Sequence, residues 1–329
     1  MNFWKNKKVL VTGGAGFVGS HVVELLVEGG ARVKVIDNLV NGVFTNLAQV
    51  EDEVEFVNGD LRNFDVCKDA SRDMDIVLNI AAKVGGIAFN QKHPGTMFRD
   101  NIVINTNMLE AARLSNIERF LVVSSACVYP RFCKIPTPET EGFEGVPEPT
   151  NDGYGWAKRM AEFQASAYAR EFGMKIAIAR PYNAYGPRDH FDPEKSHVIP
   201  ALIKRVFDGE NPLTVWGDGE QSRAFLYVTD LAHGLLEVTE KYAETDPINL
   251  GTDEEIKIKD LVRLILDLSC KDIEFFFDTS KPSGQPRRNC DNTKAKAKIG
   301  FEAKVTLKEG LKKTIEWYVA NRMKIDSTK

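Results

Sequence analysis

The chain has 329 residues, of which 43% are hydrophobic and 27% charged, and its formal net charge is -4 at pH 7. This composition is that of an ordinary globular protein, long enough for one large domain or two smaller ones. The slightly negative net charge does not indicate binding to nucleic acid or to a membrane surface. A polyanionic ligand would therefore need local basic residues. No apolar run approaches membrane-spanning length, which argues against a membrane protein.

The cysteines indicate a reducing compartment. There are five of them, scattered along the chain: Cys67, Cys127, Cys133, Cys270 and Cys290. They show neither the spacing of zinc ligands nor a disulfide framework, so we expect free thiols and no metal site. The N-terminal residues lead directly into an apolar strand without an apolar signal segment. We therefore expect a cytoplasmic protein.

A glycine-rich turn stands between a predicted strand and a predicted helix near the start of the chain. Residues 8–12 form an apolar strand, Gly13-Gly14-Ala15-Gly16-Phe17-Val18-Gly19 follows, residues 20–29 are helical, and residues 32–36 form a second strand. This context is the one in which such glycines bind a dinucleotide. They allow close backbone approach to a pyrophosphate, and the helix N-terminus offers amide groups and a positive dipole.

Asp37 ends the second strand, and Asn38 and Leu39 follow it without a nearby basic residue. A carboxylate at this place accepts hydrogen bonds from the ribose hydroxyls of adenosine and repels a 2′-phosphate. The sequence therefore predicts NAD rather than NADP as the cofactor. An aspartate that only caps a turn is the alternative.

Strands and helices alternate through the first 180 residues. Further strands are predicted at 54–57, 75–79, 119–123 and 175–179, and helices at 105–113 and 154–172. Strict alternation predicts an α/β fold with a doubly wound parallel sheet of the Rossmann type, whose ligands lie at the carboxyl ends of the strands. The residues that follow strands, and therefore converge on one edge, are Gly13, Asp37, Asp60, Ala81, Ser124 and Pro181.

The alternation stops beyond Pro181, which predicts a second, smaller α/β domain built from discontinuous segments. A loop at 182–196 precedes a helix at 198–207, an extended segment at 213–216, an apparent return to the sheet over 225–250, and helices at 258–268 and 307–321. We predict a dinucleotide-binding domain of residues 1–180 plus about 222–250. Residues 181–221 plus about 251–329 would form the substrate-binding domain.

Tyr154 and Lys158 are four residues apart on a predicted helix and therefore share one face. A free phenol has a pKa near ~10, and an ammonium held close to it favours the phenolate. The pair is a candidate general base for a substrate hydroxyl. Taken alone, the pair is better explained as an ordinary contact on a helix surface.

These motifs together resemble the extended short-chain dehydrogenases that modify nucleotide sugars. The resemblance rests on the glycine loop, Asp37, Ser125, the Tyr154–Lys158 pair and the segment RPYNAYGP at 180–187, and it covers nearly the whole chain. The segments AAKVGG at 81–86, SSACVYP at 124–130 and SHVIPAL at 196–202 are similar to those of GDP-fucose synthases. The serine–cysteine stretch and RNCDN at 288–292 also resemble GDP-mannose 3,5-epimerases.

The resemblance implies a role for each catalytic residue. Tyr154 would take the hydroxyl proton as hydride passes to the nicotinamide, Lys158 would hold the tyrosine, and Ser125 would donate a hydrogen bond to the sugar oxygen. A ketone at C4 makes the protons at C3 and C5 acidic, and Cys127 and His197 would exchange those protons. On the residues alone, Cys127 is also explained as a small buried side chain and His197 as the start of a helix.

Further residues are assigned to the cofactor or the substrate by the resemblance. The expected cofactor contacts are Gly13, Gly16, Phe17, Val18, Asp37, Asn38, Asp60, Leu61, Ala81, Ala82, Lys83, Asn101, Ser124, Tyr154, Lys158 and Pro181. The expected substrate contacts are Val84, Gly85, Ser125, Cys127, Asn183, His197, Val198, Arg205, Trp216, Arg223, Arg287 and Arg288. Guanidinium groups suit a diphosphate because they are planar and permanently charged, and one of Arg287 and Arg288 is expected to be only a surface residue.

Asp37 separates two interpretations of the resemblance. A GDP-fucose synthase consumes NADPH, whereas Asp37 favours a redox-neutral epimerase on bound NAD. Val198 stands where a GDP-mannose 3,5-epimerase would carry a lysine. We predict a homodimeric NAD-dependent nucleotide-sugar epimerase, with or without a reductase step, that inverts C3 and C5 of a GDP-linked hexose or 4-keto-6-deoxyhexose. A UDP-hexose 4-epimerase and a non-catalytic NAD-sensing protein of the same fold are the alternatives.

Overall fold

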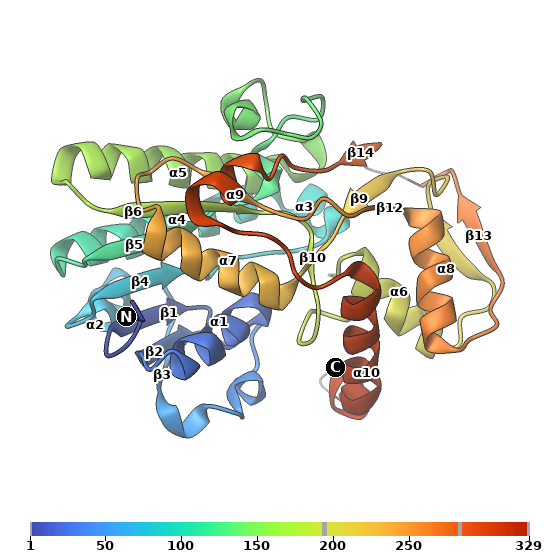
Figure 1. The fold of residues 1–329 in the computed structure, drawn as a ribbon, viewed down its shortest axis with the longest axis horizontal. Helices are drawn as coiled ribbons and strands as arrows, with labels where there is room; N and C mark the ends of the chain where they lie inside the picture. The colour runs from blue at the N-terminus through green and yellow to red at the C-terminus, as the bar shows by residue number, and fades with distance from the viewer. Residues whose placement is uncertain (1, 193–195, 282–284, 328–329) are drawn as a thin grey trace.

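A seven-stranded parallel sheet forms the centre of the computed structural model, which describes residues 2–192, 196–281 and 285–327 (Figure 1). The strand order is β11-β6-β5-β4-β1-β2-β3, and every neighbouring pair is parallel. The strands are β1 (Lys8–Thr12), β2 (Arg32–Asp37), β3 (Val54–Asn58), β4 (Ile76–Asn79), β5 (Arg119–Val123), β6 (Ile176–Pro181) and β11 (Ile248–Leu250). The predicted doubly wound α/β fold is therefore confirmed.

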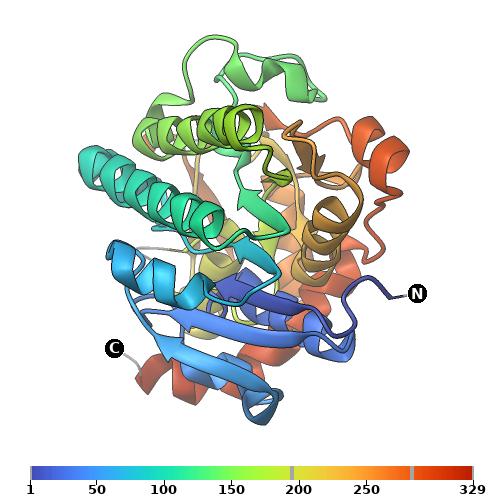
Figure 2. The same ribbon diagram turned by 90° about the vertical axis from the view of Figure 1, so that its left-hand side faces the viewer.

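Helices cover both faces of the sheet, and the side chains of β1 show why its three central residues are all apolar (Figures 1 and 2). Val9 and Val11 pack into one core cluster with α1 (Phe17–Glu28) and α7 (Val228–Lys241). Leu10 packs on the opposite face with helices α2 (Phe64–Ser71), α4 (Pro94–Leu114) and α5 (Asp152–Phe172). Alternate residues of a strand point to opposite faces, so a sheet covered on both sides needs apolar residues at every position.

A second core cluster lies apart from the sheet, on the right of Figure 1. Its larger elements are α6 (Val198–Phe207), β8 (Leu213–Trp216), α8 (Ile258–Ser269), β13 (Phe275–Asp278) and α10 (Leu307–Ser327). The short strands between the clusters are β7 (Ala184–Tyr185), β9 (Ser222–Ala224), β10 (Leu226–Tyr227), β12 (Glu255–Lys257) and β14 (Arg287–Arg288). The remaining helices are α3 (Ile87–Lys92) and α9 (Thr293–Ile299).

One of the predicted returns to the sheet is wrong. Residues 225–228 do not rejoin the main sheet: β10 pairs with β7, and β9 pairs with β12 and β14. Phe225 and Tyr227 point into the second core cluster while Leu226 points into the first, so this segment bridges the two clusters. Only β11 returns to the sheet, beside β6.

The helix predicted at 105–113 is much longer, because α4 begins at Pro94. Hydrophobic periodicity missed its first half, where the buried residues include Asp100 and Asn101. Their polar groups are satisfied locally, for example by the bond from Asn101 Nδ2 to the Met97 carbonyl oxygen at 2.8 Å. Within the described residues, no helix has both the length and the apolar character needed to cross a membrane.

Candidate active site

The glycine loop folds tightly over the first turn of α1. Gly13 has a φ of +67°, and a Cβ atom there would lie 2.9 Å from the Ala81 Cα. A Cβ atom on Gly19 would lie 2.1 Å from the Gly13 carbonyl oxygen, so both positions require glycine. Gly16 is the N-cap of α1, and no side chain caps this helix. The free amide groups at the N-terminus fit the pyrophosphate of a dinucleotide.

Asp37 lies against this loop. Its Oδ2 accepts a hydrogen bond from the Ala15 amide at 3.1 Å, and its Oδ1 accepts one from the Leu39 amide at 2.9 Å. Burial raises the pKa of the Asp37 carboxyl above its usual value. A carboxylate at the end of β2, beside the glycine loop, fits the adenosine ribose of a bound dinucleotide.

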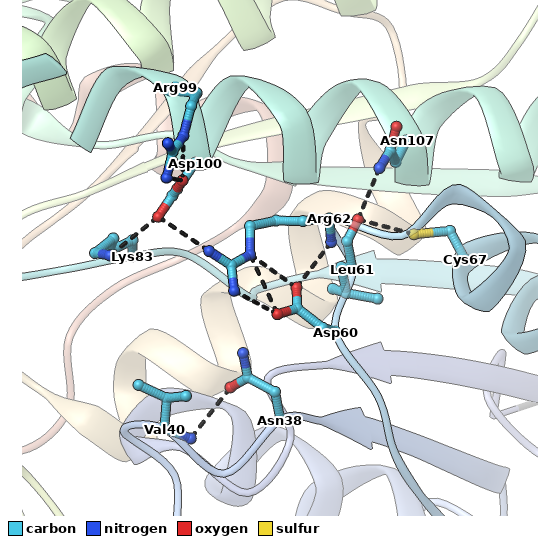
Figure 3. Close-up of polar contacts among 10 residues, drawn as sticks. All are labelled: Asn38, Val40, Asp60, Leu61, Arg62, Cys67, Lys83, Arg99, Asp100 and Asn107. Atoms are coloured by element: carbon cyan, nitrogen blue, oxygen red, sulfur yellow. Dashed lines mark hydrogen bonds and ion pairs between the residues drawn. The ribbon is translucent and has the colours of Figure 1, made fainter. Parts of the chain in front are cut away.

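A charged network at the ends of β3 and β4 was not predicted (Figure 3). Arg62 donates to the Asp60 carboxylate through Nε at 3.0 Å and Nη2 at 2.6 Å, and these bonds lower the pKa of Asp60 to about 2. Asp100, which is 2% exposed, accepts from Lys83 Nζ at 3.0 Å and also pairs with Arg99. Arg62, Lys83 and Arg99 are thus each paired with a carboxylate.

Ser125, Tyr154 and Lys158 come together at the end of β5. Ser125 hydrogen-bonds to Tyr154, and its Oγ accepts a bond from the Cys127 amide at 3.1 Å. Lys158 is buried, donates from Nζ to the Val123 carbonyl oxygen at 2.7 Å, and has this nitrogen 5.4 Å from the centroid of the Tyr154 ring. The three side chains form the arrangement needed to move a proton at a substrate hydroxyl.

The pKa values in this group differ from the simple expectation. Burial raises the pKa of Tyr154 far above its usual value, opposed by the hydrogen bond with Ser125. Burial also lowers the pKa of Lys158 to about 8, opposed by the nearby Cys127 and Glu162. The net lowering expected for the pKa of Tyr154 is therefore not found, because desolvation of the phenol, and then the nearby Cys127, set the direction of its shift.

The lowered pKa of Lys158 predicts a loss of activity on the alkaline side. The ammonium favours the phenolate only while protonated, so its contribution is present below a pH of about 8 and lost above it. We expect kcat/KM to fall as pH rises through this range. The Lys158→Arg variant keeps its charge and should move that fall beyond pH ~10. An unchanged alkaline limb in the variant would assign the titration to another group.

A buried ion pair, also not predicted, lies beneath Lys158. Glu162 is one turn further along α5 and receives two bonds from Arg180, through Nε at 2.9 Å and Nη2 at 2.7 Å. The same carboxylate accepts a hydrogen bond from the hydroxyl of Ser124, the neighbour of Ser125. Both charged side chains are 2% exposed. The pair therefore ties together α5, β5 and β6 directly behind the catalytic group.

Cys127 lies beside an arginine of the C-terminal region. Arg288 Nη2 is 3.7 Å from the Cys127 Sγ, and Arg288 also lies over the Tyr182 ring. His197 is the N-cap of α6, and burial together with Arg288 lowers its pKa. Desolvation by the surrounding chain dominates this shift although the residue itself is exposed, so its imidazole keeps contact with solvent.

The predicted arginines divide into two kinds. Arg287 is exposed and paired with Glu255 at 2.8 Å, and Arg205 is held by Glu210 at 2.6 Å, so neither guanidinium is free for a phosphate. Arg223 donates from Nη1 to the Ser222 carbonyl oxygen at 2.7 Å, and burial and then Arg288 lower its pKa to about 10. Arg223 and Arg288 are register partners on the adjacent strands β9 and β14. They form a pair of poorly compensated cations.

Most of the other predicted site residues lie in loops and at the ends of helices and strands. Lys83 exchanges two backbone bonds with the Asn101 side chain, each 3.0 Å long. Asn183 has a φ of +30° and donates to the Ala224 carbonyl oxygen at 2.8 Å. The remaining positions are the first residues of α1 (Phe17, Val18), the turn after β2 (Asn38), the segment after β3 (Leu61), the loop after β4 (Ala82, Val84, Gly85), the last residue of β6 (Pro181), the start of α6 (Val198) and the end of β8 (Trp216). Among the described residues, no group of three or more His, Cys, Asp or Glu is placed to hold a metal ion.

The glycine loop, Asp37 and the Ser–Tyr–Lys group define a dinucleotide-dependent enzyme of the extended short-chain dehydrogenase type. Residues 9–251 match the NAD-dependent epimerase/dehydratase family, and the chain belongs to it. The chain is 35% identical over 322 residues to the probable GDP-L-fucose synthase 1 of Oryza sativa subsp. japonica, covering 96% of this chain and 93% of that protein. GDP-mannose 3,5-epimerase 1 of the same plant is 31% identical, covering 96% and 83%.

Solved structures share the fold over the whole chain. The UDP-glucose 4-epimerase of Thermotoga maritima, solved with UDP-glucose, has a TM-score of 0.87 and 32% identity, covering 96% of this chain and 99% of that one. Structures of this fold hold NAD in one case and NADP in another. The family therefore uses a nicotinamide dinucleotide, and the choice between the two has to come from this chain's own residues.

Proposed function

We propose that the chain is a redox-neutral, NAD-dependent epimerase that inverts C3 and C5 of a GDP-linked hexose. One observation carries this proposal: Arg288 Nη2 lies 3.7 Å from the Cys127 thiol, two residues beyond Ser125. A thiol beside a cation thus lies next to the Ser–Tyr–Lys group that would make the ketone. Relatives named GDP-L-fucose synthase and GDP-mannose 3,5-epimerase support the GDP-sugar class.

In this proposal each side chain moves or holds a proton at a stated place. Tyr154 removes the proton of the C4 hydroxyl, and Ser125 donates a hydrogen bond to the same oxygen as the ketone forms. NAD, when bound, accepts and returns the C4 hydride. Cys127 and His197 then remove and deliver protons at the carbons next to the ketone, on opposite faces of the ring. Tyr154 returns its proton when the ketone is reduced again.

The choice of NAD rests on the electrostatics of the adenosine end. Asp37 is buried against the glycine loop, where its charge would repel a 2′-phosphate. The nearby cations Arg62, Lys83 and Arg99 are paired with Asp60 and Asp100 (Figure 3). A bound 2′-phosphate would have to break these pairs. A cofactor retained through the cycle also fits a reaction without net reduction.

The diphosphate of the substrate is assigned to Arg223 and Arg288. Both belong to the small sheet β12-β9-β14, and the charge of Arg288 lowers the pKa of Arg223. A dianion between the two guanidiniums would relieve this repulsion. We further propose a homodimer through α4 and α5, which expose Phe98 and Phe163, and a cytoplasmic location, which accords with five unpaired cysteines.

The test is proton exchange from solvent, combined with the choice of nucleotide. A thermal-shift panel of GDP-, UDP-, dTDP- and CDP-sugars identifies the base, because a bound ligand raises the unfolding temperature. The stabilising sugar nucleotide is then incubated with the protein in D₂O. We expect a GDP-sugar to stabilise the protein and deuterium to appear at C3 and C5. Stabilisation by UDP-sugars and inversion at C4 without exchange would favour the alternative UDP-hexose 4-epimerase.

A further inference from the structure

Glu148 is a buried carboxylate that the proposed reaction does not use. It lies between Pro147 and Pro149, just before the short 3-10 helix (Pro149–Asn151) that leads into α5. The residue is 5% exposed. Its Oε1 accepts a bond from the Thr150 hydroxyl at 3.3 Å and lies 3.9 Å from Arg131 Nη1. Its Oε2 is buried and has no hydrogen-bond partner. A buried anion left with an unpaired oxygen is costly, and therefore calls for a partner.

The backbone places Glu148 beside the candidate active site. A Cβ atom on Gly155, the neighbour of Tyr154, would meet both the Pro147 side chain at 2.7 Å and the Cys127 carbonyl oxygen at 2.5 Å. Pro147 forms an isolated antiparallel bridge with Pro130, whose carbonyl oxygen accepts a bond from Gln285 Nε2 at 3.3 Å. The segment that carries Glu148 therefore lies near the residues that precede β14 (Figure 1). The residues before α5 and those before Arg288 thus border the same region as Cys127.

The Glu148 charge acts on both proposed phosphate ligands without pairing with either. The carboxylate attracts Arg223 and Arg288 electrostatically. Among the described residues, its one ion pair is the long contact with Arg131, so it does not neutralise the two guanidiniums directly. The region therefore offers two cations and, a short distance away, one anionic acceptor.

We propose that Glu148 accepts hydrogen bonds from hydroxyl groups of the hexose of the bound sugar nucleotide. A carboxylate has only acceptor sites and repels a phosphate, whereas the vicinal hydroxyls of a sugar are donors. A diphosphate on Arg223 and Arg288 leaves the attached sugar to meet Cys127, Tyr154 and Glu148. Glu148 is then a specificity residue that selects a hydroxylated sugar and fixes its ring relative to Cys127. This inference rests on the proposed function.

The test compares a nucleotide with its own sugar derivative. Calorimetry measures the affinity of GDP and of GDP-mannose for the wild type and for the Glu148→Gln and Glu148→Ala variants. Since hydrogen bonds to a charged group stabilise a complex substantially, we expect Glu148→Ala to weaken GDP-mannose binding by about 10- to 100-fold and to leave GDP binding unchanged. Glu148→Gln keeps one acceptor oxygen and should lose less. The exposed Glu144→Gln is the matched control and should change neither affinity.

Other outcomes would overturn the inference, and they differ from failure of the proposed function. Tighter GDP binding by Glu148→Gln, with an unchanged ratio of the two affinities, would make Glu148 a counter-ion of the arginines. Equal weakening of both ligands, with a lower unfolding temperature, would make it a structural support. If the wild type binds neither GDP compound, the same pair of measurements is made with UDP and UDP-glucose. Failure of every nucleotide to bind would contradict the proposed function itself.

Discussion

Replacement of Tyr154 by phenylalanine is expected to reduce the turnover of the sugar nucleotide by about 10²- to 10⁴-fold, the contribution of a positioned general base. The variant removes one oxygen atom, the hydrogen-bond partner of Ser125, from the face of α5 that meets the end of β5. Without the phenolic oxygen, no residue takes the proton of the C4 hydroxyl as the hydride leaves. The rate of sugar oxidation under single-turnover conditions measures this step directly.

The same helix supplies a matched control for the tyrosine variant. Tyr168 also lies on α5, but its hydroxyl bonds to Glu110 of α4 at 3.1 Å, away from the site. Tyr168→Phe should retain the wild-type rate. Mass spectrometry of the denatured proteins should show NAD with all three forms, because Tyr154 does not hold the dinucleotide by itself. Wild-type turnover by Tyr154→Phe would remove the tyrosine from the mechanism.

Replacement of Cys127 by alanine is expected to lower deuterium incorporation from solvent at C3 and C5 by a similar factor, about 10²- to 10⁴-fold, since it deletes one of the two proton-exchanging groups. Oxidation at C4 should continue, because Ser125, Tyr154 and Lys158 are untouched. The variant therefore separates two steps that a simple assay of product formation would merge. Nuclear magnetic resonance of the sugar recovered from D₂O distinguishes exchange at each carbon.

Cys133 provides the control for the thiol. It is also free, half-buried and close in sequence, and its Sγ contacts the Thr137 hydroxyl at 3.4 Å. Cys133→Ala should exchange deuterium at the wild-type rate. Full exchange by the Cys127 variant would instead indicate that the cysteine is only a small buried side chain, and that another group exchanges these protons.

The parts of the fold that depend on local sequence were predictable. A tight turn with a left-handed residue needs glycine, as at Gly13, and a close backbone approach needs glycine, as at Gly19. The loop before α1 was therefore predictable from these two residues. The apolar runs of β1, β4 and β5 predicted strands that are covered on both faces. The spacing of Tyr154 and Lys158 predicted that they share one face of a helix. Each of these signals lies within a few neighbouring residues.

The polar pairs that support the site could not be predicted in the same way. Glu162 and Arg180 meet because α5 packs on β6, and neither residue identifies the other in the sequence. Arg205 is paired with Glu210 and Arg287 with Glu255, and the sequence does not identify either pair. An arginine count therefore gives the candidates for a phosphate site, but the acidic neighbours decide which of them keep their charge unpaired.

The return of the chain to the sheet has a consequence for how this protein can be cut and recombined. The edge strand β11 follows α6 and β8 of the second core cluster in the chain. The same is true of helix α7, which packs on α1. A fragment that ends after β6 would lack the helix that packs on α1 and leave β6 as a bare edge. The central sheet with its covering helices is therefore not one continuous segment of the chain. Exchange of the second core cluster between relatives would require three junctions: one after β6, one before α7 and one after β11.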